Sequence, residues 1–201
     1  SKLKKIFRGV NCVFHLAGLA DIVPSIEKPN RYYETNVTGT LNILEAAKIN
    51  KVKKVIYAAS ASCYGKSPKF PTDEKCKIFT EYPYALTKNL GEKLVIHWNK
   101  VYNLNTSSFR FFNVYGPRSR TTGAYGAVFG VFLSQKVNNM PLTIVGNGKQ
   151  TRDFIHVKDL VSALILAIKK SKPGEIYNIG YGKETSVNKI AKLIGGKKTY
   201  I

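Results

Sequence analysis

Apolar positions in the first half of the chain fall into short unbroken runs, separated by longer stretches with helical spacing. Two such runs predict strands, at Val10–Ala17 and Val55–Ala59, and a third strand is predicted at Asn105–Phe112, which mixes polar and aromatic side chains. Because nearly continuous apolar runs are typical of strands buried on both faces, they indicate a parallel sheet. Between the first two runs, residues Arg31 to Ile49 repeat apolar side chains at helical intervals. Strand, helix and strand together predict a right-handed βαβ unit.

A second helix is predicted to start at Pro83, since proline fits the first turn of a helix. Apolar side chains follow at intervals of four, at Leu86, Leu90, Leu94 and Trp98. This spacing places the four side chains on one helical face, so we expect that face to bury against the sheet.

After Phe112 the alternation of strand and helix loosens. The predicted elements are a helix near Ala127–Val137, a strand at Leu142–Val145, a helix at Val157–Lys169, a strand at Ile176–Ile179 and a helix near Val187–Ile194. We therefore predict an α/β protein with helices on both faces of a parallel sheet in residues 1–112. Residues 113–201 are predicted to form mostly a smaller α/β domain, interleaved with sheet elements around 142–179.

Composition narrows the class of protein. The 201 residues are 44% hydrophobic, enough for a sizeable core. The sequence holds no apolar run of about 20 residues and no signal peptide, so we expect a cytoplasmic protein without a membrane partner. Its three cysteines form no Cys-x-x-Cys pair, so neither a disulfide framework nor a metal site is predicted.

The formal net charge of +20 is the one unusual bulk property. It fits a nucleic-acid surface, a field that attracts anionic ligands, or lysine-rich solvated faces. The lysines are spread along the sequence rather than gathered in one arm, and aromatic-plus-basic RNA motifs are missing. Nucleic acid is therefore not the expected partner.

Candidate chemistry lies between Ser60 and Lys88. A spacing of four puts Tyr84 and Lys88 one turn apart on the same helical face. The ammonium can then stabilise the phenolate of Tyr84, and the hydroxyl of Ser60 can hydrogen-bond an oxygen that is losing its proton. Ser60 follows the Val55–Ala59 run, and open α/β sheets bind their ligands at the carboxyl ends of strands. The trio suits removal of a proton from an alcohol.

Six motifs stand in the order found in one family: His15-Leu16-Ala17-Gly18, Asn36-Val37-Thr38-Gly39-Thr40, Ser60 to Gly65, Tyr84 to Lys88, Phe112 to Pro117 and Arg152 to Val157. On these motifs the chain resembles the extended short-chain dehydrogenases/reductases. Within them it is similar to the nucleotide-sugar epimerases/dehydratases, above all the UDP-sugar 4-epimerases. The resemblance implies a Rossmann-like domain whose N-terminal βαβ part, with its glycine-rich phosphate turn, is missing before Val10. It also makes residues 113–201 mostly a domain for the nucleotide-sugar.

The resemblance further implies NAD as cofactor, a UDP-sugar as substrate and a homodimer. Ser60, Tyr84 and Lys88 would be catalytic. Residues near the cofactor would be Leu16, Ala17, Gly18, Leu19, Ala20, Thr35, Asn36, Tyr84, Lys88 and Phe112. Substrate-binding residues would be Ser60, Ser62, Tyr84, Asn113 and Arg152. Arg152 would hold the diphosphate, because its guanidinium can make paired, charge-assisted hydrogen bonds.

The implied reaction is inversion of C4 of a UDP-hexose through a 4-keto intermediate, with Tyr84 as the base. Dehydratases and decarboxylases of the family resemble one another in having acidic residues after the catalytic hydroxyl, whereas this chain has Ala61 and Ser62. That difference favours an epimerase over a dehydratase, decarboxylase or reductase. An alternative of another class is a non-catalytic basic scaffold or nucleic-acid-binding protein.

Overall fold

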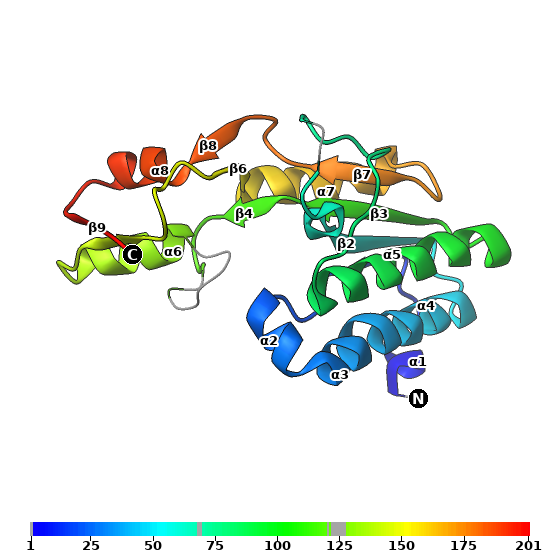
Figure 1. The fold of residues 1–201 in the computed structure, drawn as a ribbon. Coiled ribbons are helices and arrows are strands. Elements are labelled where there is room, and N and C mark those ends of the chain that lie inside the picture. Colours follow the sequence, from blue (N-terminus) through cyan, green and yellow to red (C-terminus); the bar gives the residue numbers. More distant parts are fainter. Residues whose placement is uncertain (1, 68–69, 120, 122–127) are drawn as a thin grey trace. The chain divides into compact units, whose positions relative to one another are not determined.

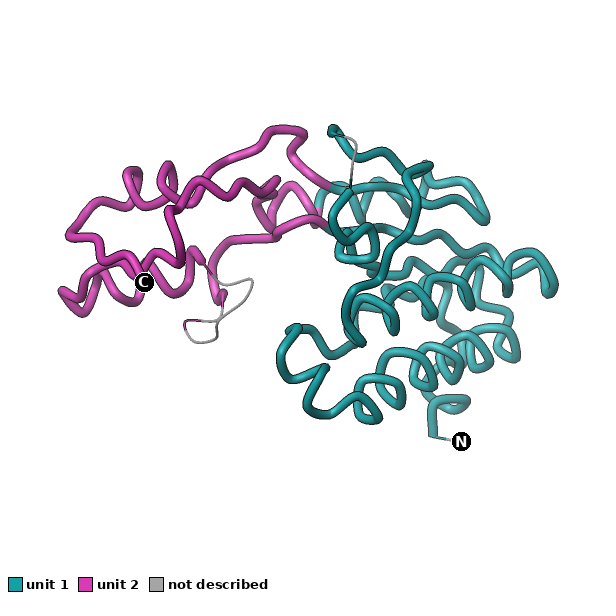
Figure 2. Tube along the Cα trace, viewed as in Figure 1, with its two compact units in different colours: residues 1–111, 162–179 teal, residues 112–161, 180–201 magenta. Residues whose placement is uncertain are grey.

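The computed structural model describes residues 2–67, 70–119, 121 and 128–201. The chain divides into two compact units (Figure 2). Unit 1 comprises residues 1–111 and 162–179, and unit 2 comprises residues 112–161 and 180–201. The C-terminal part of the sequence therefore contributes to both units.

Unit 1 is built on a four-stranded parallel sheet in the order β1-β2-β3-β7. Its strands are β1 (Cys12–His15), β2 (Lys54–Ser60), β3 (Thr106–Phe111) and β7 (Ile176–Ile179). All seven residues of β2 are buried, as its apolar run predicts. This parallel sheet with its helices confirms the predicted fold class (Figure 1).

The two faces of β2 pack against different helices. Val55, Tyr57 and Ala59 join the core that α4 (Gly39–Ile49) and α5 (Pro83–Tyr102) form. Lys54 points the other way, and its Nζ donates to the carbonyl oxygens of Ala167 (2.9 Å), Ile168 (3.1 Å) and Ser171 (2.9 Å) at the end of α7 (Val157–Lys170). A buried ammonium thus binds the carbonyl groups at the end of a helix, where the helix itself provides few donors.

The helical segments of unit 1 are α1 (Lys2–Ile6), α2 (Ile22–Glu27), α3 (Pro29–Tyr32), α4 (Gly39–Ile49) and α5 (Pro83–Tyr102). A π-helix, η1 (Tyr33–Thr38), joins α3 to α4, and a 3₁₀ helix, η2 (Ala61–Tyr64), follows β2. The single helix predicted from Arg31 to Ile49 is therefore α3, η1 and α4 in succession, with Pro29 at the start.

The face of α5 that packs inward differs from the predicted one. Leu86, Leu90 and Leu94 are half-buried rather than buried. The buried positions of α5 are Ala85, Thr87, Lys88, Asn89, Gly91, Glu92, Val95 and Trp98. A Cβ at Gly91 would lie 2.3 Å from the Tyr57 Oη, so the glycine lets α5 approach β2 more closely than a leucine face could. Of the predicted row, Trp98 is buried and Leu94 packs against the core. Leu86 and Leu90 are not the residues that face the sheet, because backbone proximity and not side-chain size decides this contact.

Unit 2 contains two small sheets and its own core. In one sheet, β4 (Asn113–Tyr115) pairs in parallel with β6 (Thr151–His156), and β6 pairs in antiparallel with β8 (Glu184–Ser186). In the other, β5 (Leu142–Ile144) pairs in parallel with β9 (Lys198–Tyr200). The core consists of Phe132, Leu142, Ile144, Ile190 and Ala191.

The helices after Phe112 agree with the predicted ones. They are α6 (Val128–Val137), α7 (Val157–Lys170) and α8 (Val187–Ile194). Ala127, where the first was predicted to begin, lies outside the described residues. Within the described part of the chain, no helix is both long and apolar enough to cross a membrane.

Candidate active site

Ser60 stands at the carboxyl end of β2, where the strand gives way to η2. Its Oγ accepts a hydrogen bond from the Ser62 backbone N–H (3.2 Å) and donates one to the Ser62 Oγ (3.0 Å). Ser60 therefore caps η2, which fixes its hydroxyl at the end of the sheet. Ser60 is buried, whereas Ser62 is exposed.

Tyr84 is the second residue of α5, directly after Pro83. Burial raises the pKa of Tyr84, and a hydrogen bond with the side chain of Ser60 lowers it. The carboxylate of Asp21 raises the same pKa. The fold thus joins Ser60 and Tyr84, which are 24 positions apart in the sequence.

Lys88 lies one helical turn after Tyr84 and is only 6% exposed. Its Nζ lies 4.6 Å from the centroid of the Tyr57 ring. Burial lowers the pKa of Lys88 to about 8. Among the described residues, none accepts a hydrogen bond from this ammonium. A cation held largely out of water, with an aromatic ring and no hydrogen-bond acceptor beside it, is costly, and such groups gather at functional sites.

Gly18 brings the turn after β1 next to this lysine. A Cβ at Gly18 would lie 3.1 Å from the Asn36 Oδ1 and 3.5 Å from the Lys88 Nζ. Leu16, Ala17, Gly18 and Ala20 are exposed, and Leu19 is half-buried. The turn therefore offers accessible backbone beside a buried positive charge, as a ligand that contacts main chain requires.

Asn36 holds the turn in place. Its Oδ1 accepts a hydrogen bond from the Leu19 N–H (2.7 Å), and its Nδ2 donates to the Leu19 carbonyl (3.0 Å) and to the Thr87 Oγ1 (3.1 Å). The side chain is 1% exposed, so its hydrogen-bonding groups are committed to the protein. Thr35, its neighbour on η1, is half-buried.

A buried ionic network, which the sequence analysis did not predict, connects β3, α5 and η2. Arg110 on β3 pairs with Glu92 on α5 through Nη2–Oε1 (2.6 Å) and Nε–Oε2 (3.0 Å). Arg110 also donates from Nη1 to the Tyr64 Oη (2.7 Å), and Tyr64 donates to the Asn178 Oδ1 (2.8 Å). The network fixes the end of the helical turn that Ser60 caps. A charged residue inside a predicted buried strand, Arg110, was the available signal.

The two predicted substrate residues of unit 2 lie on one face of the β4–β6–β8 sheet. Asn113 is the partner of Phe154 in the register, and Arg152 is the partner of Thr185. Residues that face each other across a ladder share a face, and so do residues two apart on a strand. Arg152 and Phe154 are two apart on β6, so Asn113, Arg152, Phe154 and Thr185 share one face.

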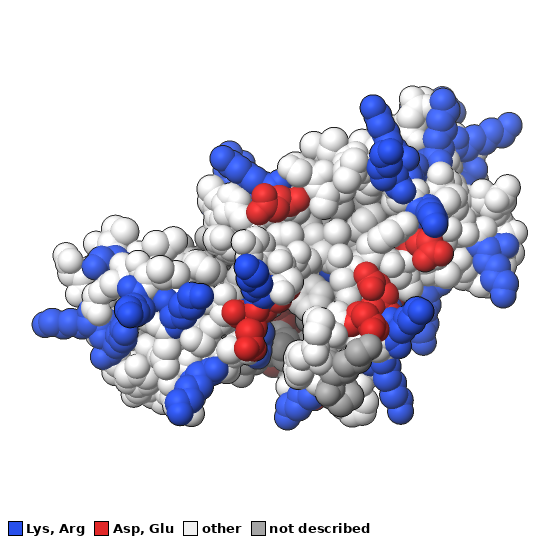
Figure 3. All heavy atoms as spheres, turned by 90° about the horizontal axis from the view of Figure 1, so that it is seen from above, with Lys and Arg blue, Asp and Glu red and all other residues white. Residues whose placement is uncertain are grey.

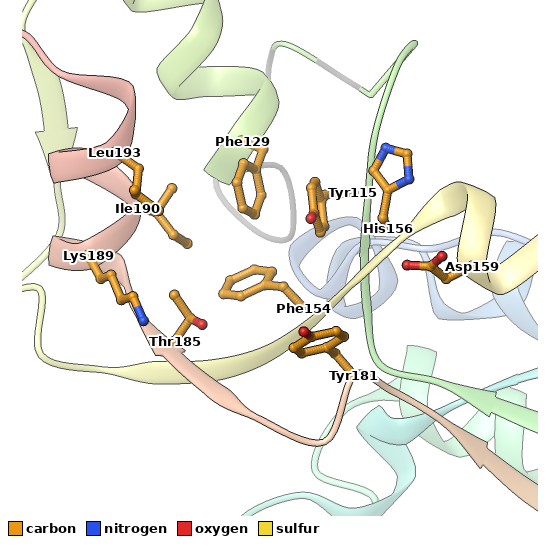
Figure 4. Close-up of a pocket in the computed structure, with 10 residues that line it drawn as sticks. All are labelled: Tyr115, Phe129, Phe154, His156, Asp159, Tyr181, Thr185, Lys189, Ile190 and Leu193. Carbon is orange, nitrogen blue, oxygen red and sulfur yellow. The ribbon is translucent and has the colours of Figure 1, made fainter.

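A pocket of about 400 Å³ opens on that face (Figure 4). Its lining is Tyr115, Phe129, Phe154, His156, Asp159, Tyr181, Thr185, Lys189, Ile190 and Leu193. Tyr115 and Phe129 stack, with ring centroids 4.3 Å apart. Aromatic walls with a few charged groups suit a ligand that combines a flat ring with a polar part.

The remaining predicted residues keep accessible groups. Arg152 is exposed, and its Nη1 donates to the Thr151 carbonyl (2.7 Å). Within the described part of the chain it makes no ion pair. Asn113 is half-buried and donates from Nδ2 to the Asp153 carbonyl (2.9 Å). Phe112, also half-buried, directly follows β3.

Known proteins match nearly the whole chain. UDP-N-acetyl-alpha-D-glucosaminuronate decarboxylase of Bacillus cytotoxicus is 39% identical over 189 residues, covering 90% of this chain and 57% of that protein. UDP-glucose 4-epimerase of Mycolicibacterium smegmatis is 34% identical over 185 residues, covering 92% and 59%. The structure of UDP-N-acetylglucosamine 4-epimerase from Methanobrevibacter ruminantium M1, in complex with UDP-N-acetylmuramic acid, is 33% identical. Its TM-score is 0.94, with coverage of 100% of this chain and 66% of that one.

The chain spans about three fifths of the length of the curated relatives it matches. The model of the NAD dependent epimerase/dehydratase family matches residues 1–180. That match extends over most of the chain and contains Ser60, Tyr84 and Lys88. The chain therefore belongs to the NAD dependent epimerase/dehydratase family, which confirms the predicted resemblance.

Proposed function

We propose that this protein inverts C4 of a UDP-hexose through a 4-keto intermediate, using NAD and with Tyr84 as the base. One observation carries the proposal: the fold gathers Ser60, Tyr84 and Lys88 beside the turn at Gly18. A hydroxyl, a phenol and a buried ammonium together favour removal of a proton from an alcohol.

The residues at Gly18 and Lys88 fit NAD. The ammonium of Lys88 lacks an acceptor among the described residues, and a side chain at Gly18 would fill the space beside it. Lys88 would hold the nicotinamide ribose. The turn from Leu16 to Ala20, with Thr35 and Phe112, would line the cofactor. Bound NAD supplies a hydride acceptor that also returns the hydride.

The protein's own residues would handle the proton. Tyr84 takes it from the 4-hydroxyl of the sugar and later gives it back. Ser60 hydrogen-bonds the sugar oxygen, with Ser62 beside it in the substrate site, and Lys88 keeps the phenolate accessible near neutral pH by its charge. Burial raises the Tyr84 pKa, so this charge has to offset that burial.

The nucleotide half of the substrate would bind on the pocket-bearing face of unit 2. Arg152 has guanidinium nitrogens available for a diphosphate, and Asn113 shares its face. The aromatic lining of the pocket suits a uracil ring.

The epimerase is favoured over a dehydratase or decarboxylase by the residues that follow Ser60. Ala61 and Ser62 supply no carboxylate to carry a proton in an elimination. One carboxylate, that of Asp21, does act on Tyr84, and a decarboxylase is among the relatives. The product of the reaction therefore has to be identified directly.

The test is the full-length protein incubated with NAD and with UDP-glucose, UDP-N-acetylglucosamine or UDP-glucuronate, with products resolved by NMR. We expect the C4 epimer of one of them. Loss of CO₂ or of water would instead assign the alternative activities, and absence of turnover with salt-dependent oligonucleotide binding would favour the non-catalytic alternative.

Tyr84→Phe should lower kcat by about 10²- to 10⁴-fold, because it removes the proton acceptor and little volume. Binding of UDP, measured by calorimetry, should stay within a few-fold of wild type. A variant that keeps more than about a hundredth of the activity would exclude Tyr84 as the base.

A further inference from the structure

Four segments of unit 1 lie side by side at the amino ends of its parallel strands: residues 2–11, 48–54, 100–105 and 169–175. Hydrogen bonds within these segments or at the first strand residue after them tie neighbours together, between Asn50 and Lys4 (3.1 Å), Lys53 and Asn11 (2.9 Å), Val55 and Asn105 (2.9 Å), and Gly174 and Thr106 (2.7 Å). The segments are far apart in sequence but form one continuous edge of the unit.

This edge is strongly basic. Its exposed cationic residues are Lys2, Lys4, Lys5, Arg8, Lys51, Lys53, Lys100, Lys169, Lys170 and Lys172, which we call the basic face. Glu175 is the one acidic residue in the sequence of the four segments. Figure 3, which views one side of the molecule, shows lysine and arginine side chains projecting from its surface, with acidic side chains in a few small groups. Ten cations against one carboxylate leave a large unbalanced charge.

Composition alone does not produce this edge. At the opposite, carboxyl ends of the strands, the described residues of 16–21 and 61–82 hold a nearly balanced set. The cations there are Lys66, Lys75 and Lys77, and the acids are Asp21, Asp73, Glu74 and Glu81. The charge of unit 1 is therefore polarised along its strands.

Helix stability accounts for only part of the basic face. Lysines in the last turn of a helix offset the partial negative charge of its carbonyls. That applies to Lys4, Lys5, Lys100, Lys169 and Lys170. The other five, Lys2, Arg8, Lys51, Lys53 and Lys172, lie outside the last turns of helices and add repulsion without this compensation.

Exposed apolar side chains lie among these cations. They are Ile6 (58% exposed), Ile49 (48%), Val101 (53%), Tyr102 (45%) and Ile168 (40%). Apolar side chains interleaved with lysines are typical of proteins that adsorb to the boundary between lipid headgroups and acyl chains.

We propose that the basic face docks on an anionic lipid bilayer, adsorbing without spanning it. Nine of its ten cations are lysines, which act as point charges suited to a diffuse layer of headgroups and lack the fork that arginine uses on nucleic acid. The exposed aliphatic side chains would enter the headgroup region, whereas they have no role on a phosphate backbone. The sequence predicted no membrane partner because it holds no long apolar run, but a face that adsorbs without spanning needs none, and the fold gathers lysines that are dispersed along the sequence. This inference is independent of the proposed enzymatic activity.

The test is sedimentation of the full-length protein with phosphatidylcholine vesicles, with and without phosphatidylglycerol. We expect binding that requires phosphatidylglycerol and weakens as salt is raised. Lys53→Glu with Lys172→Glu should weaken the partition coefficient by at least about tenfold, because each lysine near an anionic surface contributes roughly fivefold. Lys53 and Lys172 make their hydrogen bonds through backbone groups, so the exchange should leave the fold intact, as circular dichroism would verify.

The matched control is Lys75→Glu with Lys77→Glu, which changes net charge equally at the carboxyl ends of the strands. Its vesicle binding should stay within about twofold of wild type. If both double variants lose vesicle binding equally, net charge alone explains the binding, and the proposed docking face is wrong. Failure of the wild-type protein to bind anionic vesicles would overturn it too. So would tighter binding to a DNA duplex than to the vesicles at the same ionic strength, if the Lys53→Glu/Lys172→Glu variant also loses affinity for the duplex.

Discussion

At the scale of single residues, burial of Lys88 in the candidate site lowers the free energy of unfolding. It is buried with no hydrogen-bond acceptor among the described residues, and burial lowers its pKa to about 8. The unfolded chain keeps this proton up to a pH near 10.5, the ordinary value. Below about pH 8 both states are charged, and the folded state bears the full desolvation cost.

Lys88→Met should therefore stabilise the protein at pH 7, by up to about 3 kcal/mol. Between pH 8 and 10.5 the folded state sheds the proton first, so wild-type stability rises with pH and the advantage of the variant shrinks. Urea unfolding at pH 7 and at pH 10 measures both. A variant that is less stable than wild type at pH 7 would contradict the desolvation cost.

The same substitution should move the pH dependence of turnover upward in the full-length protein. Without the neighbouring cation, Tyr84 stays protonated at neutral pH, and activity should return under alkaline conditions. If the pH profile is unchanged, Lys88 does not tune the tyrosine.

Arg152→Ala should raise KM for the UDP-sugar about 30- to 150-fold with little change in kcat. A diphosphate anchor distant from C4 binds the ground state and the transition state about equally, so its loss affects binding and not the chemical step. Steady-state kinetics on the full-length variant decides between the roles. A normal KM with a collapsed kcat would move Arg152 into the chemistry.

At the scale of elements, the contact of α5 with β2 depends on one missing side chain. Gly91→Ala adds a Cβ 2.3 Å from the Tyr57 Oη and 3.2 Å from the Asn36 carbonyl oxygen. We expect a loss of about 1 to 3 kcal/mol, although alanine is the better helix former. In the control Gly39→Ala on α4, the added Cβ meets only the Glu34 carbonyl oxygen at 3.7 Å. That variant should gain up to about 1 kcal/mol. Shifts of the urea midpoint in opposite directions for the two variants, relative to wild type, would support the close contact. Equal gains in stability would refute it.

Elements defined by their own composition were predictable from the sequence. The buried run of β2, the proline at the start of α5 and the amphipathic α8 each fix their structure locally. Other short strands were not predictable, although the short β5 and β7 were predicted from their apolar residues. β4, β8 and β9 have three residues each and exist because partners distant in sequence pair with them. Their hydrogen bonds come from the fold and leave no periodic pattern.

Part of the candidate site was likewise predictable from the sequence, and part was not. The spacing of Tyr84 and Lys88 and the position of Ser60 after a strand predicted the trio, because helix geometry and strand ends act locally. The roles of Asn36 and Arg110 depend on groups at Leu19 and Glu92, which only the folded chain brings near. The inward face of α5 was missed for the same reason.

At the scale of the whole molecule, the net charge of +20 should make stability depend on salt. Like charges repel more in the compact state than in the unfolded chain, and salt screens this repulsion. Raising NaCl from about 0.01 M to about 0.15 M should increase the free energy of unfolding by on the order of 1 kcal/mol. Urea titrations at the two concentrations measure it, with Lys53→Glu/Lys172→Glu as the variant that should respond less. A fall in stability with salt would mean that attractive ion pairs dominate.

The strand order β1-β2-β3-β7 has a consequence during synthesis. β3 ends at Phe111, and its neighbour β7 begins only at Ile176. At about 5 to 20 residues per second, a ribosome needs roughly 3 to 13 s to deliver that partner. For this interval the nascent chain carries an open strand edge, which invites pairing with other chains. β3, the strand whose edge is open during this interval, is unusually polar for a buried strand, with the sequence Thr106-Ser107-Ser108-Phe109-Arg110-Phe111. The buried charge and the three hydroxyl groups make that edge a poor template for aggregation. The polar composition of β3 therefore protects the nascent chain during synthesis, in addition to its role in the folded protein.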